Sequence, residues 1–294
     1  MSERYILSCE STVDLPFSYI NSRDISVLFY TYMIDGKEFT DNMGRDEEAL
    51  AEFYRFIKEG SLPTTSQINT YRYIEYFENL ILKGDIIHIA FGSGMTPSVT
   101  NAREAAELVR ARHPERRLIV IDSLASSVGY GLLVESAADL RDSGADIDSL
   151  EKWVLDHRLN VHHQFFSTDL TMFKRSGRVS GPSAMIGTVL GICPIMHLNE
   201  EGRIIAYDKV RGKKAAINRT VETIAKNFSP LPEYGDKCYI GHSNAIELAE
   251  MTSTAIQNKI PALQGKVTIT DIGTIIASHC GPGTIAVFFY GVQR

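Results

Sequence analysis

Short apolar runs alternate with amphipathic helical segments in the first half of the chain, and this alternation constrains the fold more than any other feature. Three runs have the length of strands and lie at 4–9, 85–91 and 118–121. The segments with a helical spacing of apolar residues are 46–58, 98–111 and 127–141. Strands that alternate with helices form a mostly parallel sheet covered by helices on both faces. The first half therefore predicts an α/β domain of this kind.

The second half has a different pattern, which predicts a mixed sheet with helices. Residues 193–198 and 203–210 are typical of a hairpin, with Asn199-Glu200-Glu201-Gly202 as its loop. The other expected strands are 165–167, 239–242, 267–272 and 285–290, and the expected helices are 184–190 and 213–226. Because 294 residues exceed what one hydrophobic core usually serves, we expect two α/β domains, 1–160 and 161–294.

Composition and charge exclude several classes of function. A net charge of −6 provides no overall attraction to nucleic acid or to anionic membranes. No apolar run approaches the roughly 20 residues that span a bilayer, and the N-terminal residues do not resemble a secretory signal. Cys9, Cys193, Cys238 and Cys280 lie too far apart for a zinc site or a disulfide framework. We therefore expect a soluble, cytoplasmic protein without a metal, a cofactor or integral membrane association.

Polar turns follow several of the expected strands and mark the first place to look for a site. Ser11, Ser93 and Ser123 each come just after a strand, where ligands gather in parallel sheets. The turn Phe91-Gly92-Ser93-Gly94-Met95-Thr96 also precedes a helix, and its glycines would let the backbone approach a ligand. It matches neither the dinucleotide fingerprint nor the nucleophile elbow of hydrolases. A plain connection between strand and helix stays open.

Three further segments carry polar chemistry. The hydroxyls of Thr64-Thr65-Ser66-Gln67 either cap the following helix or hold an anion at its N-terminus. The stiff turn Gly281-Pro282-Gly283 would fix the preceding His279, which is either structural or part of a clamp for a carboxylate or phosphate. The cations of 174–180 and 209–214 are either solvated surface or attract a partner or a phosphate.

Seven motifs in order give the chain a family resemblance. They are Ser11-Thr12-Val13-Asp14-Leu15-Pro16, Thr64-Thr65-Ser66-Gln67, Gly92-Ser93-Gly94-Met95-Thr96, Ile121-Asp122-Ser123, Gly177-Arg178-Val179-Ser180, Lys209-Val210-Arg211 with Lys213-Lys214-Ala215, and His279 with Gly281-Pro282-Gly283. With this set the sequence resembles the DegV family of bacterial fatty-acid-binding proteins over essentially its whole length. The resemblance implies two α/β domains with one long-chain fatty acid buried between them.

The resemblance also implies roles for single residues. Thr65, Ser66, Ser93 and Gly94 would bind the carboxylate, with His279 and Arg178 close to it. Family members include the fatty-acid-binding subunits of bacterial fatty acid kinases, in which a separate kinase forms the acyl phosphate. By that analogy Arg211, Lys213 and Lys214 are candidates for docking a kinase. As the apolar lining we expect Met185, Ile186, Val189, Leu190 and Ile192.

The head-group turn departs from the family pattern. Gly92, Thr96 and Pro97 replace the usual Ser, Ser and Gly, and Glu10 stands where Asp is usual. Thr96 keeps a hydroxyl, whereas Pro97 removes an N–H donor.

The leading hypothesis is a fatty-acid carrier without catalytic residues, because the chain contains no convincing catalytic set. The alternative is an acyl hydrolase or transferase with Ser93 as nucleophile and His279 as base. A nucleotide-binding domain is a third reading, but the chain lacks the phosphate-loop lysine and the dinucleotide fingerprint. For the carrier we expect Ser93→Ala and Thr65→Ala each to weaken fatty-acid binding.

Overall fold

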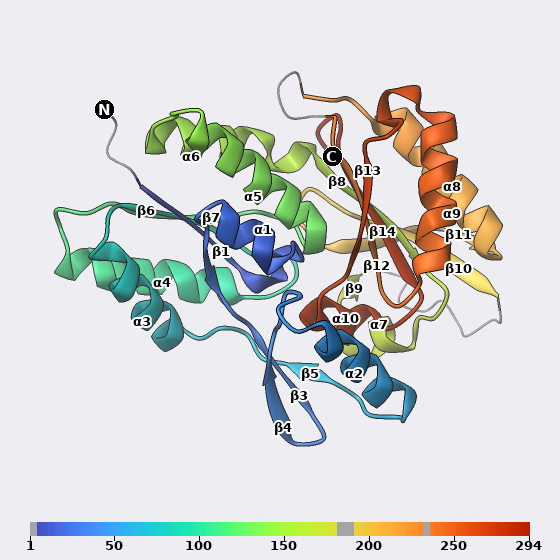
Figure 1. The fold of residues 1–294 in the computed structure, drawn as a ribbon, viewed down its shortest axis with the longest axis horizontal. Helices are drawn as coiled ribbons and strands as arrows, with labels where there is room; N and C mark the ends of the chain where they lie inside the picture. The colour runs from blue at the N-terminus through green and yellow to red at the C-terminus, as the bar shows by residue number, and fades with distance from the viewer. Residues whose placement is uncertain (1–4, 181–190, 232–235) are drawn as a thin grey trace.

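The chain forms an α/β structure with two main sheets and a small third sheet (Figure 1). The structure is a computed structural model that describes residues 5–180, 191–231 and 236–294. The expected helix at 184–190 and the expected lining residues Met185, Ile186, Val189 and Leu190 lie outside this described part.

The first main sheet is parallel and has the strand order β2-β1-β6-β7. Every residue of β6 is buried, as expected for a strand whose sheet is covered on both faces. The strands are β1 (Ile6–Glu10), β2 (Ser26–Leu28), β6 (Ile86–Ala90) and β7 (Leu118–Asp122). The helical segments of this part are η1 (Ser11–Val13), α1 (Phe17–Ser22), α3 (Thr70–Ile81), α4 (Ser98–Arg112), α5 (Ser127–Asp142), α6 (Ile147–His157) and η2 (Arg158–Asn160).

A small antiparallel sheet, which the sequence analysis did not anticipate, has the order β4-β3-β5. It consists of β3 (Thr31–Ile34), β4 (Lys37–Thr40) and β5 (Thr64–Thr65). Helix α2 (Glu47–Lys58) lies between β4 and β5 in the chain. Asp35 and Gly36 join β3 to β4 with positive φ angles of 49° and 79°, as tight hairpins require. The pairing of Tyr32 with Thr65 holds Thr65 in place.

The second main sheet is mixed and has the order β13-β12-β14-β8-β10-β11-β9. Its strands are β8 (Val161–Ser167), β9 (Val179–Ser180), β10 (Ile192–Leu198), β11 (Ile204–Arg211), β12 (Cys238–His242), β13 (Val267–Asp271) and β14 (Thr284–Tyr290). The helical segments of this part are α7 (Thr171–Ser176), α8 (Lys213–Asn227), α9 (Ile246–Lys259), η4 (Pro261–Leu263) and α10 (Thr274–Cys280). The β10–β11 hairpin confirms the expected one, and the two main sheets confirm the fold class.

Helix α5 lies between the two main sheets and packs against β8, β12 and β14 (Figure 1). Its small residues permit this close contact. A Cβ atom at Gly129 would lie 2.4 Å from His163 Nε2, and one at Gly131 would lie 2.5 Å from the carbonyl oxygen of Val13. Each main sheet takes its strands from one side of residue 160, and the division into domains there stays a prediction.

Candidate functional site

Two adjacent cavities lie where segments from both halves of the chain meet. The larger one has a volume of about 250 Å³ and the smaller one about 60 Å³. They share six wall residues, namely Met95, Ser126, Phe173, Ile204, Ile276 and Cys280. The polar lining residues that belong to the larger cavity alone are together called the mouth here, and they are Tyr30, Thr65, Ser66, Gln67, Thr96, Arg178 and His279. The smaller cavity adjoins the larger one through the shared residues, and we call it the apolar cavity.

A hydrogen bond between the two halves of the chain forms the centre of the mouth. Thr65 Oγ1 lies 2.7 Å from His279 Nε2. If the imidazole donates to Thr65, the threonine hydroxyl keeps its hydrogen for a ligand. If Thr65 donates instead, Nδ1–H of the imidazole remains as the donor. Either arrangement leaves this pair one hydrogen-bond donor for an anion.

The electrostatics of the mouth favour a negative ligand. Burial, followed by the positive charges of Arg178 and Arg175, lowers the pKa of His279 from 6.5 to about 4. The imidazole is therefore neutral at pH 7 and lies close to two guanidinium groups. A carboxylate would be attracted by these charges and would receive hydrogen bonds from neutral donors.

Helix α7 and the segment before Thr65 are also joined at the mouth. The Arg175 guanidinium donates to the carbonyl oxygens of Pro63 and Leu62, each at 3.3 Å. The Arg178 guanidinium donates to the carbonyl oxygen of Ser176. The hydroxyl of Ser176 donates to the carbonyl oxygen of His279 at 3.4 Å. These bonds connect Arg178 and His279 through Ser176.

Tyr30 is a residue of the mouth that the sequence analysis missed. Its side chain is 2% exposed, and its hydroxyl lies 3.5 Å from Glu10 Oε2. Burial, together with the charge of Glu10, raises the pKa of Tyr30 well above its ordinary value, so the phenol stays neutral. Tyr30 lies in the connection between β2 and β3, and no local pattern in that connection distinguishes it.

Ser93 and Gly94 are not among the residues that line either cavity. The backbone N–H of Ser93 donates to Asp122 Oδ1 at 3.0 Å, and its side chain is exposed. A Cβ atom at Gly94 would lie 2.3 Å from the backbone of Gly202. The glycine therefore permits a close approach of other protein backbone, whereas the sequence analysis expected the approach of a ligand. The next residues, Met95 and Thr96, do line the larger cavity.

The surface of the apolar cavity is almost entirely apolar. Its lining includes Phe165, Leu198, Ile272, Ala286 and Phe288, all of which are buried. Cys280 lines both cavities, and burial raises its pKa to about 12, so the thiol is neutral. Ile192, which was expected in the lining, is not among these residues. The two cavities together suit a molecule with an anionic head and an apolar tail.

Other expectations for the polar turns are corrected. The hydroxyls before α3 do not cap it, because Asn69 is the N-cap and accepts from the backbone N–H of Arg72 at 3.0 Å. Thr65 instead ends strand β5. Ser11 and Ser123 are fully buried, and Ser11 Oγ accepts from the backbone N–H of Tyr30 at 3.1 Å. These two serines support the backbone and do not line the cavities.

Ser93 and His279, the proposed catalytic pair, have other hydrogen-bond partners. The His279 imidazole forms a hydrogen bond with Thr65, and the backbone N–H of Ser93 donates to Asp122.

The proposed docking residues lie at the end of β11 and the start of α8. They are Arg211, Lys213 and Lys214, and all three are exposed. None of the three lines the mouth. Within the described ranges no helix is both long and apolar enough to cross a membrane.

Fold and site together define a mixed α/β protein whose cavity has a polar mouth and an apolar interior. Residues 7–292 match the model of the family described as "Uncharacterised protein, DegV family", and the chain belongs to the DegV family. A DegV domain-containing protein of Clostridium perfringens is 32% identical over 290 residues, which cover 98% of each chain.

Solved structures have the same fold. The chain is similar to a fatty-acid-binding DegV family protein of Streptococcus agalactiae, with a TM-score of 0.83, 25% identity and 98% coverage of both chains. A DegV family protein of Eubacterium eligens loaded with heptadecanoic acid has a TM-score of 0.83 and 19% identity, covering 98% of this chain and 99% of the other.

Proposed function

We propose that this protein binds a long-chain fatty acid, with the carboxylate at the mouth and the acyl chain in the apolar interior. The observation that carries the proposal is the junction of the Thr65–His279 pair with an apolar cavity. A buried carboxylate needs donors in place of water, and the mouth provides neutral donors together with Arg178. The similarity to one DegV protein described as fatty-acid-binding and to another loaded with heptadecanoic acid supports the same conclusion.

In this proposal Thr65, Ser66, His279 and Arg178 bind the carboxylate, because all four line the mouth. Ser93 and Gly94 belong to the proposal as the turn that leads into Met95 and Thr96. The mouth is formed by both halves of the chain, because Thr65 and Ser66 precede residue 160 whereas Arg178 and His279 follow it. The acyl chain provides most of the affinity, at about 0.8 kcal/mol for each buried CH₂ group.

The test is to compare palmitate with hexadecanol, which has the same chain length and a neutral head group. Native mass spectrometry of protein purified without detergent should show a fatty acid carried through purification. After this lipid is removed, palmitate should raise the melting temperature of the protein, whereas hexadecanol should raise it much less. No bound lipid and no thermal shift with palmitate would overturn the proposal. Equal shifts of the melting temperature with palmitate and with hexadecanol would show that the protein does not recognise the carboxylate.

We further propose that the protein is a carrier that presents the carboxylate to a separate kinase for acyl-phosphate formation. Arg211, Lys213 and Lys214 form an exposed basic cluster on a chain with a net charge of −6, and such a cluster suits an acidic partner. Arg211→Ala should slow acyl-phosphate formation with a cognate kinase and leave palmitate binding unchanged. Lys259→Ala removes an exposed cation at the end of α9 and is the matched control. Equal rates for both variants would confine Arg211 to another role.

A further inference from the structure

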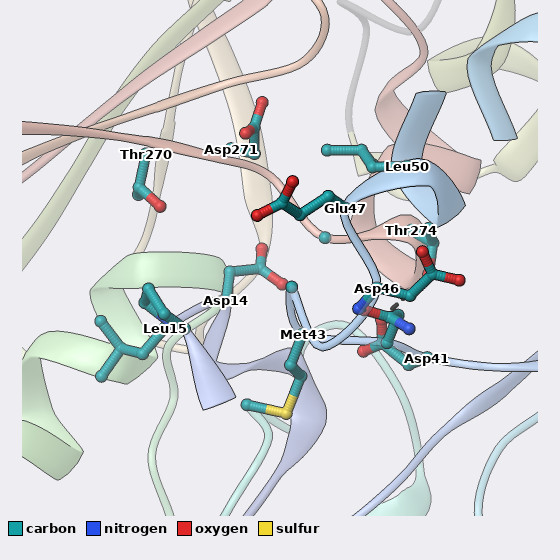
Figure 2. A pocket seen from close by; sticks show the side chains of 14 residues that line it. Asp14, Leu15, Asp41, Met43, Asp46, Glu47, Leu50, Thr270, Asp271 and Thr274 are labelled. Carbon is teal, nitrogen blue, oxygen red and sulfur yellow. Dashed lines mark hydrogen bonds between the residues drawn. The ribbon is translucent and has the colours of Figure 1, made fainter. Parts of the chain in front are cut away.

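A third cavity, of about 340 Å³, lies outside the proposed fatty-acid site (Figure 2). It is formed by the residues after η1, by the connection from β4 to α2, and by the connection from β13 to α10. Its volume lies within the range of cavities that hold small ligands. We call it the acidic cavity, because its charged lining residues are Asp14, Asp41, Asp46, Glu47 and Asp271. No Lys, Arg or His is among the described residues that line it.

Two of these carboxylates are buried and only half satisfied. Asp14 is 7% exposed and Asp41 is 1% exposed. Ser127 Oγ donates to Asp14 Oδ2, and Thr274 Oγ1 donates to Asp41 Oδ1 at 2.9 Å. The second oxygen of each group, Asp14 Oδ1 and Asp41 Oδ2, is buried without a hydrogen-bond partner among the described atoms. A buried carboxylate oxygen without a donor is costly, so a hydrogen-bond donor that enters the cavity would be stabilised there.

The two buried carboxylates converge on one point of the backbone. A Cβ atom at Gly273 would lie 2.4 Å from Asp14 Oδ1 and 3.8 Å from Asp41 Oδ1. Burial raises the pKa of both groups, and this rise is opposed at Asp14 chiefly by the hydrogen bond from Ser127 and at Asp41 by hydrogen bonds from Ser11 and Thr274. Figure 2 shows the carboxylate of Glu47 projecting toward that of Asp14 from the opposite wall. Carboxylates therefore face the cavity from both walls.

The positive charge closest in sequence belongs to Arg45, which does not line the cavity. Arg45 donates to the carbonyl oxygens of Asn42 and Asp41, at 3.0 and 3.2 Å, and its guanidinium lies 4.2 Å from the centre of the Phe29 ring. Its charge opposes the rise in the pKa of Asp41. The walls of the cavity therefore carry carboxylates with no cation among the described lining residues.

The remaining walls determine which cation fits. In the described part of the chain, no three acidic, histidine or cysteine groups are placed to hold one metal ion. The cavity is also lined by the apolar side chains of Leu15, Pro16, Met43 and Leu50. Spaced carboxylates between apolar walls suit ammonium groups joined by methylene groups, because each ammonium has three donors and the stem is apolar.

We propose that the acidic cavity binds a short aliphatic diamine. One ammonium group donates to Asp14 Oδ1 and Asp41 Oδ2, the methylene groups contact Leu15 and Met43, and the second ammonium reaches Glu47. This site is independent of the proposed fatty-acid function. Helix α10 separates the two sites, because Thr274 lines the acidic cavity whereas His279 lines the mouth.

The test is calorimetric titration of the full-length protein with cadaverine, a five-carbon diamine, and with the matched diol. Cadaverine should bind at low ionic strength and the diol should not. Glu47→Gln, on the exposed first turn of α2, should weaken cadaverine about tenfold through the loss of a charged hydrogen-bond acceptor. Glu48→Gln is the control, since Glu48 is equally exposed and does not line the cavity.

Four results would overturn the proposal. They are no binding of cadaverine, equal binding of the diol, equal weakening by Glu48→Gln and Glu47→Gln, or tighter binding of Ca²⁺ or Mg²⁺ than of cadaverine at the same site. Asp41→Asn tests the buried end, and its circular dichroism spectrum shows whether the variant is folded. A folded Asp41→Asn protein that binds cadaverine as tightly as the parent would also contradict the proposed geometry. If Asp41→Asn does not fold, the comparison of Glu47→Gln with Glu48→Gln decides whether the proposal holds.

Discussion

Thr65 Oγ1 and His279 Nε2 lie 2.7 Å apart, although 214 positions separate the two residues in the chain. Thr65 is held by the pairing of β5 with β3, and His279 is held near the end of α10. Their contact joins the two halves of the chain at the mouth of the cavity. A ligand bound at this point would therefore contact elements from both halves at once.

Thr65→Ala should weaken palmitate binding about tenfold, because it removes a donor to a charged group. Thr65→Ser keeps the hydroxyl and should bind nearly as well as the parent. Calorimetric titration of both variants measures the effect, and circular dichroism confirms that they fold. Parent-like affinity in Thr65→Ala would remove this hydroxyl from the carboxylate site.

Ser93→Ala provides the comparison that separates the lining residues from the adjacent turn. The Ser93 side chain is exposed and its backbone N–H keeps its bond to Asp122 in the variant. We therefore expect a smaller loss of palmitate affinity than in Thr65→Ala, measured by the same titration. A larger loss in Ser93→Ala would mean that the turn moves inward when the ligand binds.

The lowered pKa of His279 predicts a definite dependence of stability on pH. Its pKa is about 4 in the folded protein and 6.5 in the unfolded chain, so the unfolded state takes up the proton first. The free energy of unfolding should therefore fall as the pH decreases from about 6.5 to about 4, and this contribution should level off below that. His279→Gln should reduce the slope in this window by at most about 1.4 kcal/mol per pH unit. Urea unfolding of both proteins across the window is the measurement, and identical slopes would contradict the prediction.

The apolar cavity predicts a limit on acyl chain length. Ala286 is buried on β14 and lines the apolar cavity, so Ala286→Phe should fill part of the space. The affinity for palmitate should fall by about fourfold for each methylene group that no longer fits. The affinity for a shorter acid such as decanoate should stay the same. Ala206→Phe, on β11 and outside the lining, is the control for adding an aromatic ring. An equal loss for both acids would show that Ala286 does not limit the chain.

Glu10 predicts a large effect on stability close to the mouth. Its fully buried carboxylate accepts from the backbone N–H of Phe91 at 2.9 Å and from the hydroxyl of Tyr73, and it lies 3.3 Å from His88 Nε2. Glu10→Ala leaves these groups buried without their acceptor and should lower the free energy of unfolding by about 3–5 kcal/mol.

Exposed Glu107 on α4 is the control for this prediction, because Glu107→Ala should change stability by no more than about 0.5 kcal/mol. Urea unfolding of both variants is the measurement. If Glu10→Ala were as stable as Glu107→Ala, the buried network would have no part in holding Phe91.

Much of the fold could be predicted because it follows from local patterns. Strand β6 was recognised from its apolar run and helix α5 from the spacing of its apolar residues, and the β10–β11 hairpin was recognised from its turn. The small sheet was missed because its strands are short, and β4 alternates little since most of it is exposed. Without that sheet, the position of Thr65 next to Tyr32 could not be anticipated.

The functional sites were also predictable only where a local sequence pattern marked them. His279 was recognisable from the stiff turn that follows it, but nothing near it in the chain indicates Thr65 as its partner. The glycines around Ser93 were interpreted as space for a ligand, whereas the structure places Gly94 against Gly202. A glycine permits any close approach, and only the packing decides what approaches. The acidic cavity had no sequence signal, because its carboxylates come from separate segments.

By itself the sequence determined the alternation of strands and helices in the first half, the resemblance to a family and the residue types available for a polar mouth. These properties depend on spacing and composition, which act between residues close together in the chain. The tertiary structure decided which hydroxyl contacts the imidazole and which carboxylates face one another across a cavity. It did so because hydrogen bonds and charges act over a few ångströms in space, whatever the separation along the chain.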